Sequence, residues 1–380
     1  MSPTSSPARV GVNLLWLIPG VVGGSEEYTV NLLRAVSDLG ARSPSSIRLR
    51  VYAQPTLPMA HPDLVGRFEV LTLPVAVRTK PARFALESSW LAWHSRRDAL
   101  VHHGGGVAPY GTVGRSVVTI HDLQPLDLPQ NFSSTQRRWF SVMLPRVARV
   151  ANRVITPSLF TGRRAADLLG VEASRLSVVP PVHATVAPDV RSDPSGSRPA
   201  GSGRYLLYPA VSHRHKRHVD AVEAFVTLAD RFADLRLVFT GSPGAAAVDL
   251  AQCIDTSGLG DRIDVLGRVP AQRLETLLRG ATALVFPSVY EGFGNPLIEA
   301  MAHGVPVVAA DATALPEVAG GAAVLVQPQS PRALAEGVER VLTDGALVAR
   351  LVEAGRERAK DFTAEVAGRA LLEAYGESLG

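Results

Sequence analysis

The sequence predicts an α/β protein built from two Rossmann-like α/β/α domains. The chain has 380 residues, and chains of this length usually divide into more than one domain, each with its own hydrophobic core. Strand-like apolar runs alternate with helical patterns through both halves, an order typical of mostly parallel sheets. Between the halves, residues 186–203 are rich in Pro, Gly and Ser and carry no apolar periodicity, so we expect a linker there.

The first domain is expected over residues 1–185. It opens with the apolar run Arg9–Leu17, followed by a glycine-rich turn that includes Gly24. Residues Ser25–Val36 place apolar side chains at helical spacing, with Ser25 as the expected cap, so the opening is a βα unit. Further strands are expected at Leu49–Ala53, Phe68–Leu73, Ser116–Ile120 and Arg153–Thr156.

The second domain is expected over residues 204–362 and repeats the same alternation. The patterns predict strands at Tyr205–Pro209, Leu235–Thr240, Ile263–Leu266, Ala283–Pro287 and Val305–Ala309. They predict helices at Val219–Ala233, Pro296–Ala302, Pro331–Thr343 and Ala346–Ala359. The chain ends in one more helical pattern, Thr363–Tyr375.

Composition fits a globular enzyme. Hydrophobic residues make up 46% of the chain and charged residues 19%, which excludes wholesale disorder. The net charge of +4 reflects either the codon usage of a GC-rich genome or an anionic partner. Cys253 is the single cysteine, which excludes an internal disulfide, and the apolar run from Val10 is too short to span a membrane and lacks a basic leader. We therefore expect a cytoplasmic protein.

The stretch Phe286–Val308 carries the clearest chemical signal. A buried strand ends at Phe286, and a glycine-containing loop leads to Asn295, the expected helix cap, and to Pro296 at the expected first helical position. Ligands of open α/β sheets bind beyond the carboxyl ends of the strands. Free amides at the start of this helix, those of Gly294, Asn295 and Leu297, would suit a diphosphate.

Two glutamates flank this helix start. Glu291 lies in the loop and Glu299 in the helix, eight residues apart. The loop between them would let both line one pocket and hold different parts of an extended ligand, such as sugar and ribose hydroxyls. The alternative is a pair of solvated glutamates with no ligand.

The segment EGFGNPLIEAMAHGVPVV resembles the signature of the family 4 glycosyltransferases of the GT-B fold. GGSEEYTVNLLRAV is similar to that family's first glycine loop and helix, and TIHDLQPLDLP to its histidine–aspartate segment. ANRVITPSLFT resembles the last strand of the first domain and YPAVSHRHKRH the start of the second. DFTAEVAGRALLEAY resembles a terminal helix, here within 363–380, that crosses back to the first domain. The resemblance implies two domains that face each other across a cleft holding the active site.

The resemblance also implies roles for single residues. Glu299 would bind the nucleotide ribose, Glu291 a hydroxyl of the donor sugar near its anomeric carbon, and Lys216 the diphosphate. His121 would contact the sugar, and Gly24 would lie close to the phosphates. His121, Glu291 and Lys216 are thus the catalytic candidates. The remaining donor-binding candidates are Arg214, Gly292, Phe293, Gly294, Asn295 and Leu297, and those on the nucleobase side are Gly241, Arg268 and Val269.

Arg214 is a candidate because the family often carries an arginine where Val211 stands here, and Arg214 is the nearest substitute. A fixed cation and helix amides can stabilise a departing diphosphate without a metal ion, so we expect no cofactor and no metal. His213, His215 and His218 surround Lys216, and they form either a metal site or, as we expect, a loop of solvated histidines.

The predicted reaction is hexosyl transfer from a GDP- or UDP-sugar to an acceptor hydroxyl, with the retention of configuration that the resemblance implies. The acceptor would belong to a cell-surface polysaccharide, a glycolipid or a secondary metabolite. A nucleotide-sugar epimerase, a phosphorylase and an inactive sugar-nucleotide-binding protein on the same fold stay open as alternatives.

Basic residues interleave with tryptophan in two stretches of the first domain. Arg78–Arg97 contains Trp90 and Trp93, and Gln136–Arg153 contains Trp139. Such stretches mark either a surface that touches an anionic membrane or a solvated face over buried aromatic rings. A lipid-linked acceptor and peripheral contact with the inner face of the membrane therefore stay open. Nucleic acid is not an expected partner, because no nucleic-acid-binding fold accompanies the charge.

Overall fold

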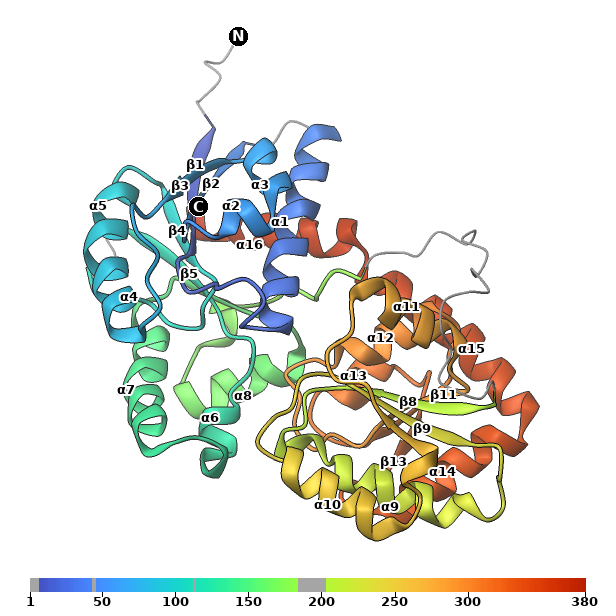
Figure 1. Cartoon of the computed structure of the whole chain (residues 1–380). Coiled ribbons are helices and arrows are strands. Elements are labelled where there is room, and N and C mark those ends of the chain that lie inside the picture. The colour runs from blue at the N-terminus through green and yellow to red at the C-terminus, as the bar shows by residue number, and fades with distance from the viewer. Residues whose placement is uncertain (1–6, 43–45, 112–113, 184–202) are drawn as a thin grey trace. The chain divides into compact units, whose positions relative to one another are not determined.

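The computed structural model of the chain describes residues 7–42, 46–111, 114–183 and 203–380 (Figure 1). The chain divides into two compact units, which are described separately below. Unit 1 comprises Met1–Val182 and Thr363–Gly380, and unit 2 comprises His183–Phe362. Apart from Gly203, the predicted linker 186–203 lies outside the described residues.

The described residues of unit 1 form a seven-stranded parallel sheet in the order β3-β2-β1-β4-β5-β6-β7. The strands are β1 (Ala8–Leu14), β2 (Ile47–Ala53), β3 (Glu69–Thr72), β4 (Leu100–His103), β5 (Arg115–Thr119), β6 (Arg153–Thr156) and β7 (Leu176–Val178). The strand order reverses its direction between β1 and β4, and in sheets of this kind the crevice at that reversal receives ligands.

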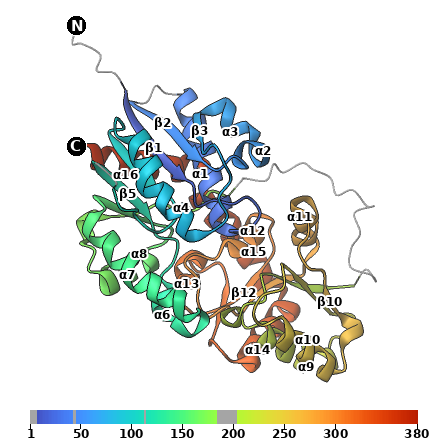
Figure 2. The same ribbon diagram turned by 60° about the vertical axis from the view of Figure 1, so that its left-hand side comes forward.

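The two faces of this sheet carry different helices (Figure 2). Side chains alternate along a strand, so Val10, Val12 and Leu14 of β1 pack against α1 (Gly24–Arg42), while Asn13 and Leu15 lie on the opposite face. That opposite face is covered by α4 (Lys80–Leu86), the π-helical turn η1 (Glu87–Leu91), α5 (Ala92–Ser95) and α7 (Ser134–Val150). Shorter elements of unit 1 are α2 (Leu57–Ala60), α3 (Pro62–Arg67), α6 (Gln124–Asp127) and α8 (Leu159–Leu169).

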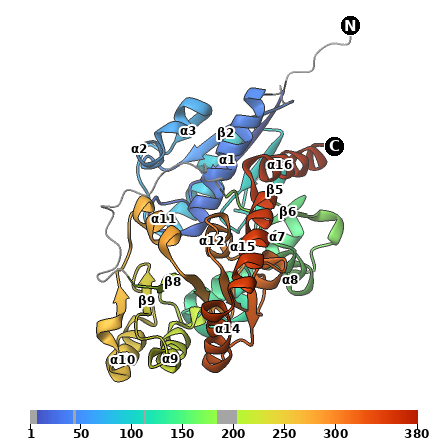
Figure 3. The same cartoon turned by 90° about the vertical axis from the view of Figure 1, so that its right-hand side faces the viewer.

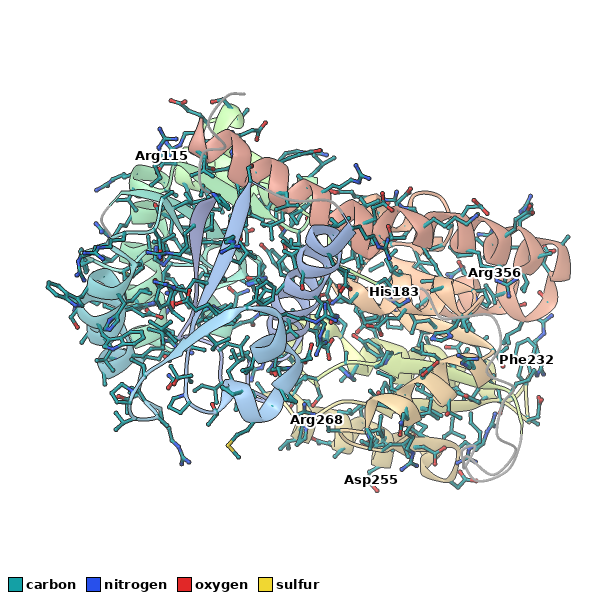
Figure 4. The ribbon with its side chains drawn as sticks, turned by 90° about the horizontal axis from the view of Figure 1, so that it is seen from above. Arg115, His183, Phe232, Asp255, Arg268 and Arg356 are labelled. Atoms are coloured by element: carbon teal, nitrogen blue, oxygen red, sulfur yellow. The ribbon has the colours of Figure 1, made fainter. Side chains whose placement is uncertain are left out.

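The terminal helix α16 (Ala364–Leu379) belongs to unit 1, where it packs beside α1. Leu371 and Tyr375 are buried in the core that α16 shares with β1, β4 and β5. The Tyr375 hydroxyl lies 2.8 Å from Nδ1 of His102, which is in β4. At the far end of α16, Arg115 donates to the carbonyl of Ser378 (Figure 4). The last helix therefore completes the first unit's core.

The described residues of unit 2 form a six-stranded parallel sheet in the order β10-β9-β8-β11-β12-β13. The strands are β8 (Tyr205–Pro209), β9 (Arg236–Thr240), β10 (Ile263–Val265), β11 (Ala283–Phe286), β12 (Val307–Ala310) and β13 (Val324–Val326). The helices, most of which are labelled in Figure 3, are α9 (His218–Ala229), α10 (Ala247–Ser257), α11 (Ala271–Gly280), α12 (Asn295–Ala302), α13 (Leu315–Ala319), α14 (Pro331–Thr343) and α15 (Gly345–Ala359). Here the order reverses between β8 and β11.

The parallel α/β organisation of both halves is confirmed, and three details of the sequence prediction are wrong. Ser25 does not cap α1, because the helix already begins at Gly24 and the Ser25 carbonyl accepts from the Thr29 hydroxyl. β6 is not the last strand of its sheet, because β7 pairs with it. The strands β4, β7 and β13 were not predicted. None of the described helices is long and apolar enough to cross a bilayer.

Candidate active site

Two loops meet at the reversal point of the unit 2 sheet. One follows β8 and contains the short turn η4 (Arg214–Lys216), and the other follows β11 and contains Ser288–Gly294. The Val289 amide donates to the His215 carbonyl at 2.9 Å, and the Ser288 hydroxyl donates to the same carbonyl at 3.4 Å. These bonds fix the two loops together at the carboxyl edge of the sheet.

Lys216 and Glu291 form an ion pair across these loops. Lys216 Nζ lies 2.5 Å from Glu291 Oε1, and the two side chains are 18% and 12% exposed. Lys216 is further held by the Tyr208 hydroxyl, which donates to its backbone carbonyl, and Nζ lies 5.4 Å from the centre of the Phe286 ring. A cation and a carboxylate that are 75 residues apart in the chain thus share one half-buried position.

The backbone of Glu291 is held by a strained residue. The Glu291 amide donates to the Thr313 hydroxyl at 3.0 Å. Thr313 lies in the loop after β12 with φ of 54°, a left-handed conformation that a β-branched residue rarely adopts. Sequence reasoning missed Thr313, and no pattern around it signals this conformation.

The helix α12 begins at Asn295 and is preceded by Gly294 with φ of 111°. A Cβ on Gly294 would lie 2.7 Å from Cδ2 of Leu315, so the position needs glycine for both conformation and space. Two predictions are corrected here. Asn295 is the first helical residue rather than the cap, which puts Pro296 second, and the Leu297 amide is not free because it donates to the Gly294 carbonyl at 3.0 Å. Among the described residues, the amides of Gly294 and Asn295 meet no hydrogen-bond acceptor.

The other candidates around α12 differ in exposure. Glu299 is half-buried in the second turn of the helix, and Gly292 is half-buried in the loop. Phe293 is 8% exposed and packs edge to face against Phe362 at 5.2 Å, while Leu297 is fully buried. Any ligand contact of Phe293 must therefore come from its backbone.

The three histidines near Lys216 do not share one environment. His213 is exposed and its ring lies parallel to that of His215 at 5.7 Å. His218 is 3% exposed and stacks on Tyr208 at 4.4 Å, and burial lowers its pKa to about 4. The expectation of a loop of solvated histidines is therefore wrong for His218. Within the described ranges, no group of three or more His, Cys, Asp or Glu side chains is placed to hold a metal ion. Arg214 is exposed.

A cavity of about 530 Å³ opens beside the nucleobase-side candidates of unit 2. Gly241, with φ of 120°, lies at its rim, and a Cβ there would come within 2.4 Å of the Ala210 carbonyl oxygen. Gly267 also lines the cavity, and Arg268 and Val269 follow it directly in the chain. The other lining residues are mostly apolar and come from β9 and α10, among them Phe239, Leu250, Ala251 and Ile254. Asp255 and Arg268 are marked in Figure 4.

In unit 1, His121 follows β5 at the carboxyl edge of the sheet. Its Nε2 lies 2.9 Å from the Gly104 carbonyl oxygen. The centre of its ring lies 5.9 Å from the centre of the Trp16 ring and 5.2 Å from that of the Tyr28 ring. Burial lowers the pKa of His121 to about 4, so the imidazole is neutral at pH 7. Gly24 begins α1, and a Cβ there would meet no atom within 4 Å among the described residues, so the position is open to a ligand.

Comparison with known proteins assigns a family model to each half of the chain. A model described as Glycosyltransferase Family 4 matches residues 22–182, and one described as Glycosyl transferases group 1 matches residues 191–358. The O-antigen chain mannosyltransferase RfbU of Salmonella typhimurium is 25% identical, over 84% of this chain and 87% of its own. The O-antigen chain mannosyltransferase B of Escherichia coli is 27% identical over 74% and 77%. The 2-deoxystreptamine glucosyltransferase of Streptomyces kanamyceticus is 32% identical over 42% of each chain.

Solved structures agree with this assignment at the level of the fold. Anabaena HepE in complex with UDP and glucose superposes with a TM-score of 0.73 at 18% identity, over 97% of this chain and 99% of its own. WaaG, a glycosyltransferase involved in lipopolysaccharide biosynthesis, superposes with a TM-score of 0.71 at 17% identity, over 95% and 98%. Both matches span the two units, and they confirm the predicted GT-B fold class.

Proposed function

Because the chain belongs to the family 4 glycosyltransferases of the GT-B fold, we propose that it transfers a hexose from a GDP- or UDP-sugar to an acceptor hydroxyl with retention of anomeric configuration. The observation that carries the proposal is the Lys216–Glu291 pair at the strand-order reversal of unit 2. Glu291 lies in the loop that leads to the amides of Gly294 and Asn295 at the start of α12, which meet no acceptor among the described residues. A cation, a carboxylate and free amides at one sheet edge suit a sugar diphosphate.

Lys216 and the amides of Gly294 and Asn295 stabilise the charge that develops on the diphosphate as the sugar–phosphate bond breaks. Such fixed donors are typically worth roughly 2.7–4 kcal/mol of barrier each. They supply the positive field that a divalent ion supplies in other transferases, so the reaction needs no metal. Glu291 accepts a hydrogen bond from a hydroxyl of the donor sugar while its ion pair keeps Lys216 in place.

Glu299 binds the ribose, and the nucleobase lies on the side of Gly241, Arg268 and Val269, where the apolar cavity gives room for a flat ring. The transferred sugar meets the acceptor on the face that the diphosphate leaves, and the departing diphosphate accepts the acceptor's proton. The glutamates therefore do not act as the paired carboxylates of a retaining glycosidase.

His121 contacts the transferred sugar as a neutral imidazole. A carbonyl oxygen only accepts hydrogen bonds, so the contact with Gly104 fixes the proton on Nε2 of His121. Nδ1 then carries the lone pair and accepts a hydrogen bond from a hydroxyl group of the sugar. A cationic histidine in this place would lose that acceptor.

The acceptor is proposed to be a saccharide of a growing polysaccharide, since two relatives are named O-antigen chain mannosyltransferases. The acceptor is further proposed to be lipid-linked and to lie at the inner face of the membrane, where the basic tryptophan-containing surface of unit 1 would contact the lipid headgroups. Trp93 is 64% exposed there, with the Arg96 guanidinium 3.9 Å from the centre of its ring.

A thermal-shift screen of GDP- and UDP-sugars tests the proposal. A donor at a hundred times its dissociation constant should raise the free energy of unfolding by about 2.7 kcal/mol. Nuclear magnetic resonance of the product should then show a new glycoside with the donor's anomeric configuration. Donor consumption that leaves an epimerised nucleotide sugar, or that requires inorganic phosphate, would replace the proposal by an epimerase or a phosphorylase. If no nucleotide sugar stabilises the protein, the donor-site proposal fails.

A further inference from the structure

Backbone strain in unit 2 gathers at the Lys216–Glu291 ion pair. In the part of the chain that the structure describes, three residues other than glycine have a positive φ: Arg217 at 55°, Thr313 at 54° and Gln329 at 57°. Arg217 follows Lys216 directly in the chain, and the Thr313 hydroxyl accepts a hydrogen bond from the Glu291 amide at 3.0 Å. One strained residue thus lies beside each partner of the ion pair, and strain of this kind is frequent at functional sites.

Thr313 is the residue of the three that suits its conformation least. It is β-branched, and such residues rarely adopt a left-handed backbone, because Cβ approaches a backbone carbonyl oxygen too closely. The Leu315 amide donates to the Ala312 carbonyl at 3.0 Å, so residues 312–315 form a turn in which Thr313 is the second residue. Turns with a positive φ at that place favour Gly, Asn or Asp. The turn alone therefore does not explain a threonine.

The Thr313 hydroxyl supplies a contact that glycine in the same turn would lack. Its partner is the backbone amide of Glu291, which lies 22 residues earlier, in the loop after β11. This amide meets no other acceptor among the described residues. Without the hydroxyl, the backbone of Glu291 would lose the hydrogen bond that fixes it.

The same turn supports the loop after β11 at a second point. Leu315 is fully buried, and a Cβ on Gly294 would lie 2.7 Å from its Cδ2. Leu315 thus packs against the end of the Glu291–Gly294 segment, while Thr313 bonds its beginning. The apolar contact of Leu315 would remain with any residue at position 313, whereas the hydrogen bond to Glu291 depends on the hydroxyl.

The position of the Glu291 backbone decides where its carboxylate lies. The Glu291 side chain is 12% exposed, and its Oε1 lies 2.5 Å from Lys216 Nζ. A shift of the backbone would therefore lengthen the ion pair or move the carboxylate away from the sugar hydroxyl that we propose as its partner. A misplacement of about 1 Å can lower the rate of a catalysed reaction about a hundredfold.

We propose that Thr313 is a positioning residue for the glycosyl transfer. Its hydroxyl holds the Glu291 backbone where the carboxylate meets both Lys216 and the donor sugar. The strained backbone of Thr313 is what brings the hydroxyl to that place. Thr313 acts through Glu291 and touches no reacting atom. The proposal rests on the proposed function, because the contact of Glu291 with the sugar is part of that function.

Three variants separate the effect of the hydroxyl from that of the backbone. Thr313→Val keeps the branched shape without the hydroxyl, Thr313→Gly removes the whole side chain, and Thr313→Ser keeps the hydroxyl. The first readout is the rate at which the best donor of the nucleotide-sugar screen releases its nucleoside diphosphate. This rate should fall at least about tenfold in the valine and glycine variants alike, and the serine variant should keep most of it.

The second readout is binding, measured by titration calorimetry. The valine and glycine variants should bind the intact donor more weakly than the wild type does, because Glu291 no longer meets the sugar. All three variants should bind the free nucleoside diphosphate like the wild type, because the proposed partners of the nucleotide are other groups, such as Glu299. A role of Thr313 in stability alone would not separate the two ligands.

Thermal stability should follow the backbone instead of the hydroxyl. Thr313→Gly should melt several degrees above Thr313→Val, since both lack the hydroxyl and only glycine adopts φ of 54° without strain. Gln329→Val is the matched control, because it places a β-branched residue in the same conformation at an exposed position of the same unit. It should lower the melting temperature and leave the release rate unchanged.

The proposal is overturned if the valine and glycine variants release nucleoside diphosphate as fast as the wild type, or if Thr313→Ser loses as much as they do. Equal losses of affinity for the donor and for the free nucleoside diphosphate would also overturn it, because Thr313 would then support the loop as a whole. A wild type that binds no nucleotide sugar would refute the proposed function itself and this proposal with it, and that result appears before any variant is made.

Discussion

At the scale of single residues, Glu291 and Glu299 are predicted to hold different parts of the donor. Glu299→Ala should weaken binding of the free nucleoside diphosphate roughly tenfold or more, because a charged hydrogen bond to the ribose is lost. Glu291→Ala should leave that affinity nearly unchanged and lower turnover, because its partner is a hydroxyl of the sugar. Titration calorimetry with GDP and UDP on both variants measures the difference, and equal losses of nucleotide affinity would reject this division of roles.

Gly294 gives a second prediction at this scale. Gly294→Ala should lower the free energy of unfolding by about 1–3 kcal/mol, since φ of 111° is strained for alanine and the new Cβ would press on Leu315. It should also weaken donor binding, because the amides of Gly294 and Asn295 would shift. Gly345→Ala is the control, since a Cβ at that first residue of α15 meets no described atom within 4 Å. Chemical denaturation that finds the two variants equally stable would contradict the prediction.

The contacts of the candidate site could be predicted from the sequence only in part. The loop after β11 was identified from its strand, glycines and proline, all of which are local signals. The pairing of Lys216 with Glu291 depends on the adjacency of β8 and β11, which are far apart in the chain. Arg83 and Glu87 are four residues apart on a helical stretch, which in a sequence indicates an ordinary surface pair, yet the Glu87 side chain is only 3% exposed in the folded chain. The left-handed Thr313 has no sequence signal at all.

At the scale of elements, most strands were predictable, including the short β6, β10 and β11, whereas β4, β7 and β13 were missed. β6 and β8 match their predicted ranges because fully buried parallel strands form continuous apolar runs. β4 has two histidines among four residues, and His102 is buried only because Tyr375 of α16 and Thr119 of β5 bond its ring. β7 and β13 have three residues each, over which no period can be recognised, although β10 of the same length was predicted.

The terminal helix α16 is predicted to be essential for the stability of unit 1. Leu371→Ala should lower the free energy of unfolding by about 2–5 kcal/mol, since Leu371 is 1% exposed in the core shared with α1. Val366→Ala on the same helix should change it by less than about 0.5 kcal/mol, because Val366 is 42% exposed. Urea denaturation of both variants measures this contrast. Similar destabilisation by the two substitutions would show that α16 does not pack as described.

At the scale of the whole molecule, buried neutral histidines should make the free energy of unfolding depend on pH. Burial lowers the pKa of His102 and His103 to about 3 and that of His121, His183 and His218 to about 4. Their pKa in the unfolded chain is about 6.5, so between pH 6.5 and 4 the unfolded state binds more protons. The free energy of unfolding should therefore fall as pH drops through this window, by about 1.4 kcal/mol per pH unit for each histidine. A stability that stays constant from pH 7 to pH 4.5 in denaturation experiments would contradict this burial.

Membrane contact is a further prediction for the whole molecule. The wild type should float with anionic vesicles at low salt and dissociate at high salt, because each basic residue near such a surface contributes about 1 kcal/mol that salt screens. Reversal of the exposed Arg96, Arg97, Arg137 and Arg138 to glutamate should abolish flotation and preserve donor binding. The same reversal at the exposed Arg273, Arg332, Arg340 and Arg350 of unit 2 is the control and should preserve both. If the wild type does not float with anionic vesicles at low salt, the arginines form a solvated face and the prediction of membrane contact is wrong.

The central claim is that Lys216, paired with Glu291, supplies the positive charge for a departing nucleoside diphosphate in place of a metal ion. The most direct measurement is the rate at which glycoside and nucleoside diphosphate form together from the best donor of the screen, with excess chelator present. We predict that the wild type keeps full activity, that Lys216→Met loses roughly a hundred- to a thousandfold in kcat, and that Lys360→Met, on the exposed surface, loses none. Full activity of Lys216→Met, or complete loss of wild-type activity on chelation with recovery on added manganese or magnesium, would contradict the claim.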